Sequence, residues 1–324
     1  MAKLAALACA AAVAATTALP AFGAEDYPSR AVQLVIPYDV GGGVDAVARI
    51  LAAHMNTAFG QPFVVDARPG GATHIGTNHV ARAKPDGYTL LLTGVSTMSL
   101  QPLIFAGITY DAIESFEPIG MVSRIPMFVS VADTAPYRDL PGLIDGAKGK
   151  PGGLSYASNG NGSLSHLSTE VLAARAGIDL THVPYKGFAP AIPDLVSGRV
   201  DMLVSDLAAV SAPLQGGSVR LLAVTSVERS PFQPDVPTVA ESGYPEYQAE
   251  NWLALYAPAG TPAPVVERLG DELRQFLKSD PAREAFARLG HVPDPTDGAA
   301  VTRRVVQEQK TYAPALEAAG LGAR

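Results

Sequence analysis

The sequence has a single cysteine, Cys9, which lies within the first ten residues. The rest of the chain therefore has no thiol for a disulfide, an iron–sulfur site or a cysteine nucleophile. Charged residues make up only 17% of the chain, and its lysines and arginines are scattered rather than clustered. With a formal net charge of −7, the protein lacks the basic patch that nucleic-acid binding requires. We therefore predict no nucleic-acid partner.

Long hydrophobic runs are also scarce, and the one present lies at the N-terminus. Residues 4–19 are uncharged and rich in alanine, follow Lys3, and precede the small residues of positions 20–23. Spanning a membrane needs ~20 strongly apolar residues, and this run is shorter and mostly alanine. The pattern is typical of a secretory signal peptide, which we place at residues 1–23. It predicts an exported protein, with a membrane anchor as the alternative.

Beyond this segment, strand-like and helix-like patterns alternate. Strands are expected at 31–37, 63–66, 88–93, 116–131, 154–157, 181–184, 202–204, 221–224 and 252–256. Helices are expected at 44–59, 75–84, 163–176, 189–197, 265–277, 281–289 and 299–318. Strand–helix–strand order at this spacing predicts an α/β fold with parallel pairing and right-handed crossovers. Because the pattern restarts, we expect two lobes, each a doubly wound, mostly parallel sheet.

The first candidate site is a glycine loop between an expected strand and an expected helix. Gly41, Gly42 and Gly43 let the backbone turn tightly and approach a ligand closely. The helix that follows presents unpaired N–H groups and the positive end of its dipole. Such a terminus can bind a carboxylate without a charged side chain. Asp45 is placed to cap this helix or to fix the loop.

The same loop also fits a loose dinucleotide-binding fingerprint. Gly41, Gly43 and Ala46 follow a strand, and Asp66 comes about 20 residues later, as in the Gly-x-Gly-x-x-Gly/Ala pattern. Nicotinamide cofactors are not freely supplied outside the cytoplasm, and the signal peptide directs this chain out of the cytoplasm. We therefore predict that the protein uses no cofactor.

A second glycine loop again joins an expected strand to an expected helix. Gly160 and Gly162 permit close backbone approach, and Ser163 is placed as a helix N-cap. Ser158, Asn159 and Ser163 offer neutral hydrogen-bonding groups. Because the two loops occupy equivalent places in the two halves, their helix N-termini could face one cleft. That arrangement predicts a ligand with carboxylates.

Ser163 and His166 also suggest an enzyme, an exported α/β hydrolase with a serine nucleophile and a histidine base. The two residues lie three apart on one expected helix, no third group is identifiable, and the Gly-x-Ser-x-Gly elbow is absent here. We predict that the protein has no catalytic residues and that His166 braces the loop.

Further polar residues follow the carboxyl ends of expected strands, where open α/β sheets bind ligands. These candidates are Thr93, Ser96, Tyr185 and Asp206. We expect Tyr185 to close over a ligand. His74 and His79 are five residues apart and have no carboxylates beside them, so we expect no metal site.

Four blocks of sequence occur in order along the chain. They are residues 27–30 with 37–45 and Arg49, residues 68–76 with 84–90, residues 156–166 with 182–187, and residues 237–245 with Trp252 and 257–262. Together they resemble the substrate-binding proteins of tripartite tricarboxylate transporters, also called the Bug family. Each block is modest alone, but the ordered set spans almost the whole chain after the signal segment.

The resemblance implies a two-lobed, type II periplasmic-binding-protein fold with the ligand cleft between the lobes, and a periplasmic location. We expect lobe 1 at residues 24–125 plus 248–324 and lobe 2 at residues 126–247. In the family, carboxylates are held mainly by backbone amides and small hydroxyl groups. By motif, this role carries over to Tyr38, Val40, Gly41, Gly42, Asp45, Ser158, Asn159 and Ser163.

The implied partners are a small organic acid or amino-acid-like ligand and the membrane permease subunits of a tripartite tricarboxylate transporter. The resemblance implies a binding protein rather than an enzyme, and we expect a monomer. A receptor of the same fold that serves sensing or scavenging is the alternative within this class, and the hydrolase is the alternative outside it.

Two positions depart from the family pattern. Residues 67–73 are Ala-Arg-Pro-Gly-Gly-Ala-Thr, where the family commonly has Asn-Arg-Pro-Gly-Ala-Gly-Gly, so we expect a differently shaped loop. Asp39 stands where the family usually has an uncharged residue. A carboxylate beside an anion-binding loop repels a second carboxylate. This departure favours a ligand with an amine or with only one carboxylate.

Overall fold

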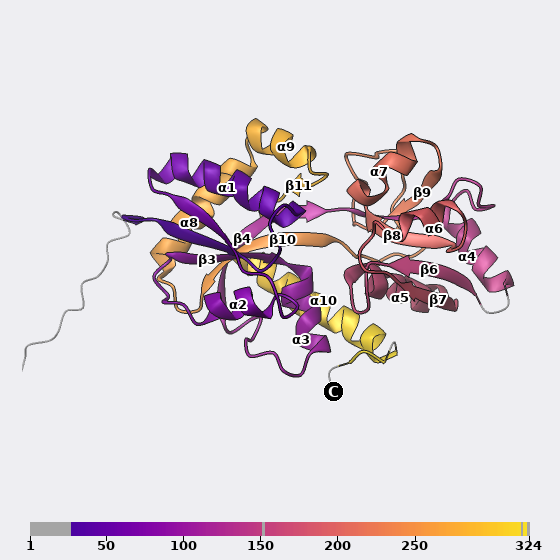
Figure 1. Cartoon of the computed structure of the whole chain (residues 1–324), viewed down its shortest axis with the longest axis horizontal. Coiled ribbons are helices and arrows are strands. Elements are labelled where there is room, and N and C mark those ends of the chain that lie inside the picture. Colours follow the sequence, from indigo (N-terminus) through magenta and orange to yellow (C-terminus); the bar gives the residue numbers. More distant parts are fainter. Residues whose placement is uncertain (1–26, 151–152, 319, 323–324) are drawn as a thin grey trace, which may run out of the picture.

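The computed structural model describes residues 27–150, 153–318 and 320–322. The predicted signal peptide lies outside the described residues. Two β-sheets lie side by side, helices cover both, and the chain passes from one to the other and back (Figure 1). The predicted α/β architecture with two lobes is confirmed. No helix in the described part of the chain is long and apolar enough to cross a membrane.

The first sheet has six strands in the order β11-β4-β10-β3-β1-β2. These strands are β1 (Val32–Ile36), β2 (Phe63–Ala67), β3 (Thr89–Gly94), β4 (Phe116–Ile125), β10 (Asn251–Pro258) and β11 (Val292–Pro293). The helices around it are α1 (Gly43–Phe59), α2 (His74–Ala81), α3 (Gln101–Ile104), α8 (Ala263–Leu277), α9 (Asp280–Ala287) and α10 (Gly298–Ala318). A π-helical turn, η2 (Ser96–Leu100), leads from β3 into α3.

The second sheet has five strands in the order β7-β6-β8-β5-β9. These strands are β5 (Met127–Ala132), β6 (Leu154–Ser158), β7 (Leu180–Pro184), β8 (Met202–Asp206) and β9 (Val219–Val224). Its helices are α4 (Leu140–Gly149), α5 (Leu164–Ala176), α6 (Ile192–Val196) and α7 (Leu207–Gln215).

The sheets are mixed, which corrects the prediction of mostly parallel ones. β1 pairs in parallel with β2 and β3, and β6 pairs in parallel with β7 and β8. In contrast, β10 is antiparallel to β3 and β4, and β5 is antiparallel to β8 and β9. Parallel neighbours require a crossover connection, usually a helix. β5 has none, because it enters from β4 with only Pro126 between them.

The central strands of the first sheet are apolar on both faces because each face packs against a different core. Leu34 and Ile36 of β1 belong to a core that includes Leu51 of α1 and Leu269 of α8. Val35, between them, faces the opposite way into a second core. This alternation is the expected result of the two-residue period of a strand, and it explains why the strands lack an alternating polar pattern.

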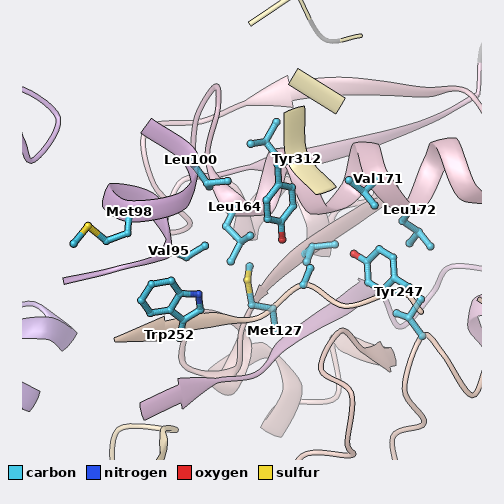
Figure 2. Packing of buried hydrophobic residues seen from close by; sticks show 14 of the residues in the cluster. Val95, Met98, Leu100, Met127, Leu164, Val171, Leu172, Tyr247, Trp252 and Tyr312 are labelled. Carbon is cyan, nitrogen blue, oxygen red and sulfur yellow. The ribbon is translucent and has the colours of Figure 1, made fainter. Parts of the chain in front are cut away.

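The second core is shared by both sheets. It combines Met98 of η2 and Tyr312 of α10 with Leu164 and Leu172 of α5, and Trp252 of β10 lies among them, fully buried (Figure 2). Burying one such large apolar side chain stabilises the fold by about 1.5–3 kcal/mol. The two lobes are therefore joined by a continuous apolar contact as well as by the connecting strands.

Several predicted helices differ in extent, and others were not predicted. The helix expected at 75–84 ends at Ala81, and the one expected at 189–197 is confined to Ile192–Val196. The helix α4 was missed although Asp139 caps it, its carboxylate accepting the N–H of Gly142 at 2.8 Å. Helix α7 was missed because Pro213 interrupts its pattern. Proline also stands at the start of α4 and α6, where its missing N–H costs nothing.

Candidate functional site

Two hollows lie at the carboxyl ends of the strands. The first, of about 460 Å³, lies within the first lobe, between the β1–α1 and β2–α2 loops. It is lined by Pro37, Tyr38, Asp39, Gly42, Gly43, Val44, Pro69, Gly70, Ala72 and Thr73. The second, of about 340 Å³, is lined by residues of both sheets. Those residues are Tyr38, Gly43, Val44, Ser96, Ile125, Asp206, Leu207, Ala208, Asn251, Leu253, Leu289, Gly290 and His291.

The second hollow, which we call the interlobe cavity, brings together three predicted site residues from distant parts of the chain. Tyr38 follows β1, Ser96 begins η2 after β3, and Asp206 ends β8 in the other sheet. The connecting strands contribute Ile125 and Asn251 to its wall. The cavity therefore lies where the two lobes meet, beside both passages of the chain between them.

The first glycine loop is shaped from within by Asp45. The Asp45 carboxylate accepts the N–H of Gly41 and the Nε–H of Arg49, both at 3.0 Å. These bonds hold the pKa of Asp45 below its usual value. Gly42 is the N-cap of α1 and makes no side-chain cap bond. Asp45 therefore fixes the loop, one of its two predicted roles, while the first N–H groups of α1 have no partner within the helix.

Tyr38 is held over the cavity by a chain of hydroxyl groups. Its hydroxyl oxygen lies 3.2 Å from the hydroxyl oxygens of both Thr93 and Thr97. The hydroxyl of Thr73 lies 3.0 Å from that of Thr97 and donates to Gln101 at 3.0 Å. Thr93 is fully buried, so it supports Tyr38 from beneath and is not itself part of either cavity wall.

The loop at residues 69–73 adopts an unusual backbone. Gly70 and Gly71 have φ values of 112° and 56°, and they are followed by Ala72 at 51° and Thr73 at 73°. A left-handed conformation is uncommon for a residue with a side chain and costs of order 1–3 kcal/mol. The hydroxyl bonds of Thr73 offset part of this cost, so a threonine is retained in a conformation that favours glycine.

The second glycine loop is supported by two stacked histidines. The ring of His166 lies on that of His182 with a centroid separation of 3.8 Å. His182 Nε2 lies 2.6 Å from Ser158 Oγ, and His166 Nδ1 accepts the N–H of Gly162 at 3.1 Å. His166 therefore braces the loop as predicted. Burial lowers the pKa of both imidazoles, that of His182 to about 4.

The same contacts argue against the hydrolase. Ser163 caps α5, its hydroxyl accepting the backbone N–H of His166 at 3.2 Å. On the His166 ring, Nδ1 accepts the backbone N–H of Gly162 rather than the hydroxyl of Ser163. A serine nucleophile must instead hydrogen-bond to the ring of its base. The pair is thus a helix cap and a loop brace.

The remaining predicted residues of the second lobe are placed differently from one another. Tyr185 donates its hydroxyl to the Asp194 carboxylate at 2.7 Å. Asn159 is exposed on the loop. Asp206 caps α7 by accepting the N–H of Ala209 at 2.9 Å, and burial raises its pKa. Of the described residues that line the two hollows, only Asp206 comes from this set.

Asn251 and His291 line the interlobe cavity but were not predicted from the sequence as site residues. Asn251 begins β10, and His291 follows α9. The His291 ring is buried, its Nδ1 lies 3.2 Å from Ser123 Oγ, and burial lowers its pKa to about 4. Neither residue lies in a recognisable motif. Only the tertiary fold brings them to the cavity, so the sequence gives no local signal for them.

Comparison with known proteins identifies the family. The family described as "Tripartite tricarboxylate transporter family receptor" (TctC) matches residues 47–321. The chain belongs to this family. It is 38% identical to Protein BugT of Bordetella pertussis over 275 residues, which cover 83% of each chain. The resemblance to the Bug family is confirmed.

Solved structures agree with this assignment. Rpa4515 of R. palustris, solved with adipate, is 34% identical with a TM-score of 0.77, covering 92% of this chain and 100% of that one. The periplasmic binding protein BugD is 35% identical with a TM-score of 0.72, with the same coverage. The TctC receptor described here thus has the predicted type II binding-protein fold, and its relatives are solute-binding proteins rather than enzymes.

Proposed function

We propose that this TctC receptor binds a small organic acid in the interlobe cavity and delivers it to the membrane permease of a tripartite transporter. The observation that carries the proposal is the cavity itself, about 340 Å³ in volume and lined by both sheets and by the first turn of α1. That volume suits a small ligand. The relative solved with adipate, a dicarboxylate, supports the same ligand class.

A carboxylate of the ligand would bind at the N-terminus of α1. Gly43 and Val44 of the first turn line the cavity together with Tyr38 and Ser96. The N–H groups and dipole of a helix N-terminus favour an anion, and the two hydroxyl groups can donate to its oxygens. Val40 and the glycines before α1 shape this end of the site.

The second lobe would complete the site as the lobes close. In this proposal the loop that carries Ser158, Asn159 and Ser163 approaches the ligand, and Tyr185 follows it. The stacked His166 and His182 keep that loop in one shape. Closure about connecting segments is a general mode of ligand capture by two-lobed proteins.

We assign residues 24–125 plus 248–324 to lobe 1 and residues 126–247 to lobe 2. The assignment is supported by the strands, because β5 to β9 form the second sheet and the other six strands form the first. Pro126 and the segment after β9 would then contain the hinge. Residues 1–23 would direct export to the periplasm, where a monomeric receptor could meet the permease.

The test is a thermal-shift and calorimetric screen of the purified protein against mono-, di- and tricarboxylates. A ligand at about 100 times its dissociation constant adds ~2.7 kcal/mol of stability. Tyr38→Phe should weaken binding of a hit by about three- to tenfold, the effect of one lost hydrogen bond. Tyr88→Phe is the matched control, because the Tyr88 hydroxyl bonds to Ser29, away from the cavity. Absence of binding by every carboxylate would contradict the proposal.

A further inference from the structure

The interlobe cavity has an unusual charge for a site that binds an acid. Among the described residues that line it, Asp206 is the one acidic side chain, and none is lysine or arginine. His291 is neutral at pH 7 because burial lowers its pKa to about 4. The one charge that these side chains can supply is therefore that of Asp206, which is opposite in sign to what a plain dicarboxylate would need.

Asp206 has no cationic partner in the described part of the chain. The ion pairs there involve other acidic residues, and the Asp206 carboxylate is instead bonded to backbone N–H groups at the start of α7, among them that of Ala209 at 2.9 Å. Burial without a cation disfavours the ionised carboxylate and raises its pKa. A cation on the ligand would supply the missing partner and remove this penalty.

The two ends of the cavity thus differ in polarity. The first turn of α1, with Gly43 and Val44, presents a positive helix end from lobe 1, whereas Asp206 presents a carboxylate from the other sheet. A ligand with an anionic group and a cationic group would match both ends at once. A ligand with two anionic ends would leave one of them facing Asp206.

We propose that Asp206 binds an ammonium group of the ligand, so that this receptor selects amino acids and other small aminocarboxylates over the corresponding plain acids. The inference rests on the proposed function, since it assigns the other end of the same ligand. The sequence suggested that Asp39 selects the ligand, but Asp39 is exposed and lines the hollow within lobe 1. Asp206, in the interlobe cavity, takes that role here. An ammonium held by Asp206 would also draw the second lobe onto the ligand.

The experiment compares matched pairs of probes that differ by one ammonium group: succinate with aspartate, glutarate with glutamate, and propionate with β-alanine. Asp206→Asn removes the charge and keeps the cap, because asparagine is an equally good N-cap. Asp139→Asn is the control, since Asp139 caps α4 in the same way and lines neither hollow. Unchanged circular dichroism and melting temperature would show that both variants fold.

We expect the wild-type protein to bind at least one aminocarboxylate about tenfold or more tightly than its plain partner, as for a charged hydrogen bond. Asp206→Asn should abolish that preference, mainly by weakening the amino member, and Asp139→Asn should keep it. A wild-type preference for the plain acids would overturn the inference, as would a preference that survives Asp206→Asn. Loss of the preference in Asp39→Asn but not in Asp206→Asn would also overturn it.

The outcomes separate this inference from the proposed function. If plain and amino acids bind equally and independently of Asp206, the acid-binding function stands and the inference fails. If no probe with a carboxylate binds but the diamine putrescine does, and Asp206→Asn removes its binding, the cation site stands and the acid-binding function fails. If nothing in the set binds, both are rejected.

Discussion

The indole Nε1 of Trp252 lies 2.9 Å from Oε1 of Glu308 and donates to it. This bond ties β10, the strand that returns to the first sheet, to the C-terminal helix α10. Glu308 also accepts from Ser99 at 2.6 Å and from Arg304 at 2.9 Å. Arg304 in turn lies 3.3 Å from Glu250, next to the start of β10. A buried network of charges therefore holds the return passage in place.

The first prediction concerns this network. Glu308→Gln should destabilise the protein by about 3 kcal/mol, because it removes one of the two carboxylates that compensate the buried charge of Arg304. Chemical denaturation measures the effect. Glu317→Gln, on an exposed position of the same helix, should change stability by less than about 0.5 kcal/mol. Equal effects of the two variants would show that the network contributes no stability.

The second prediction concerns the contact between Gly162 and Ile104, which belong to different lobes. A Cβ atom at Gly162 would lie 2.8 Å from Ile104 Cδ1, and Gly162 has a φ of 70°. Gly162→Ala should destabilise the protein by about 2 kcal/mol, through left-handed strain and overpacking. Gly177→Ala is the control, because Gly177 has a φ of 62° and no atom within 4 Å of the new Cβ.

Gly177→Ala should reduce the unfolding free energy by about 1 kcal/mol, because it introduces left-handed strain without a clash. Adding Ile104→Ala should relieve the clash, so the additional cost of Gly162→Ala in that background should approach the cost of Gly177→Ala. A double-mutant cycle of unfolding free energies checks this. If the cost of Gly162→Ala is the same with and without Ile104, the two lobes do not meet there in solution.

The third prediction concerns the strained loop. Ala72→Gly should stabilise the protein by about 0.5–1 kcal/mol, because relief of left-handed strain exceeds the entropy that glycine loses on folding. Ala53→Gly, at an exposed position inside α1, should destabilise by about 1 kcal/mol. Opposite signs in two otherwise identical substitutions are the expected result. Two losses of similar size would contradict the strained backbone at Ala72.

The fourth prediction concerns pH. His182 has a pKa lowered to about 4, mainly by burial and then by the neighbouring His166, with Glu170 acting in the opposite direction. As pH falls from about 6.5 to 4, the unfolded chain binds a proton at this position and the folded protein does not. The unfolding free energy should therefore fall more steeply in the wild type than in His182→Asn.

The comparison between the two proteins separates the His182–His166 pair from titrating groups elsewhere in the fold. Burial raises the pKa of Glu250 and of Glu308, so these carboxyls stabilise the fold as pH falls, but they are present in both proteins. Urea denaturation between pH 7 and pH 4 provides the measurement. Parallel curves for wild type and variant would exclude a role for His182 in the acid sensitivity.

The local features of the site could be predicted from sequence because they depend on near neighbours. The glycines before α1, the cap at Ser163 and the brace at His166 all act within a few residues. The partners of Tyr38 could not be predicted, because Thr93 and Thr97 reach it only when β3 pairs with β1. Asp206 was predicted as a site residue from its place at the end of a strand. Most of the other residues of the cavity wall, which leave its charge without a cationic partner, were not predicted.

The same division applies to the fold. Most helices and strands followed from periodicity, and the alternation predicted the parallel pairs correctly. The antiparallel pairs were missed because β5 and β10 are short apolar runs, and nothing in such a run records the direction of its neighbours. Their direction depends on the chain leaving one sheet and entering the other without a crossover helix.

The position of β10 also determines when the first lobe can be assembled. β10 lies between β3 and β4, which are not otherwise neighbours, and it comes from residues 251–258. The second sheet, in contrast, is built from one continuous stretch, residues 127–224. During synthesis from the N-terminus, the strands of the second sheet have therefore all emerged before those of the first. The strands β3 and β4 must remain unpaired along one edge until residues 251–258 have emerged.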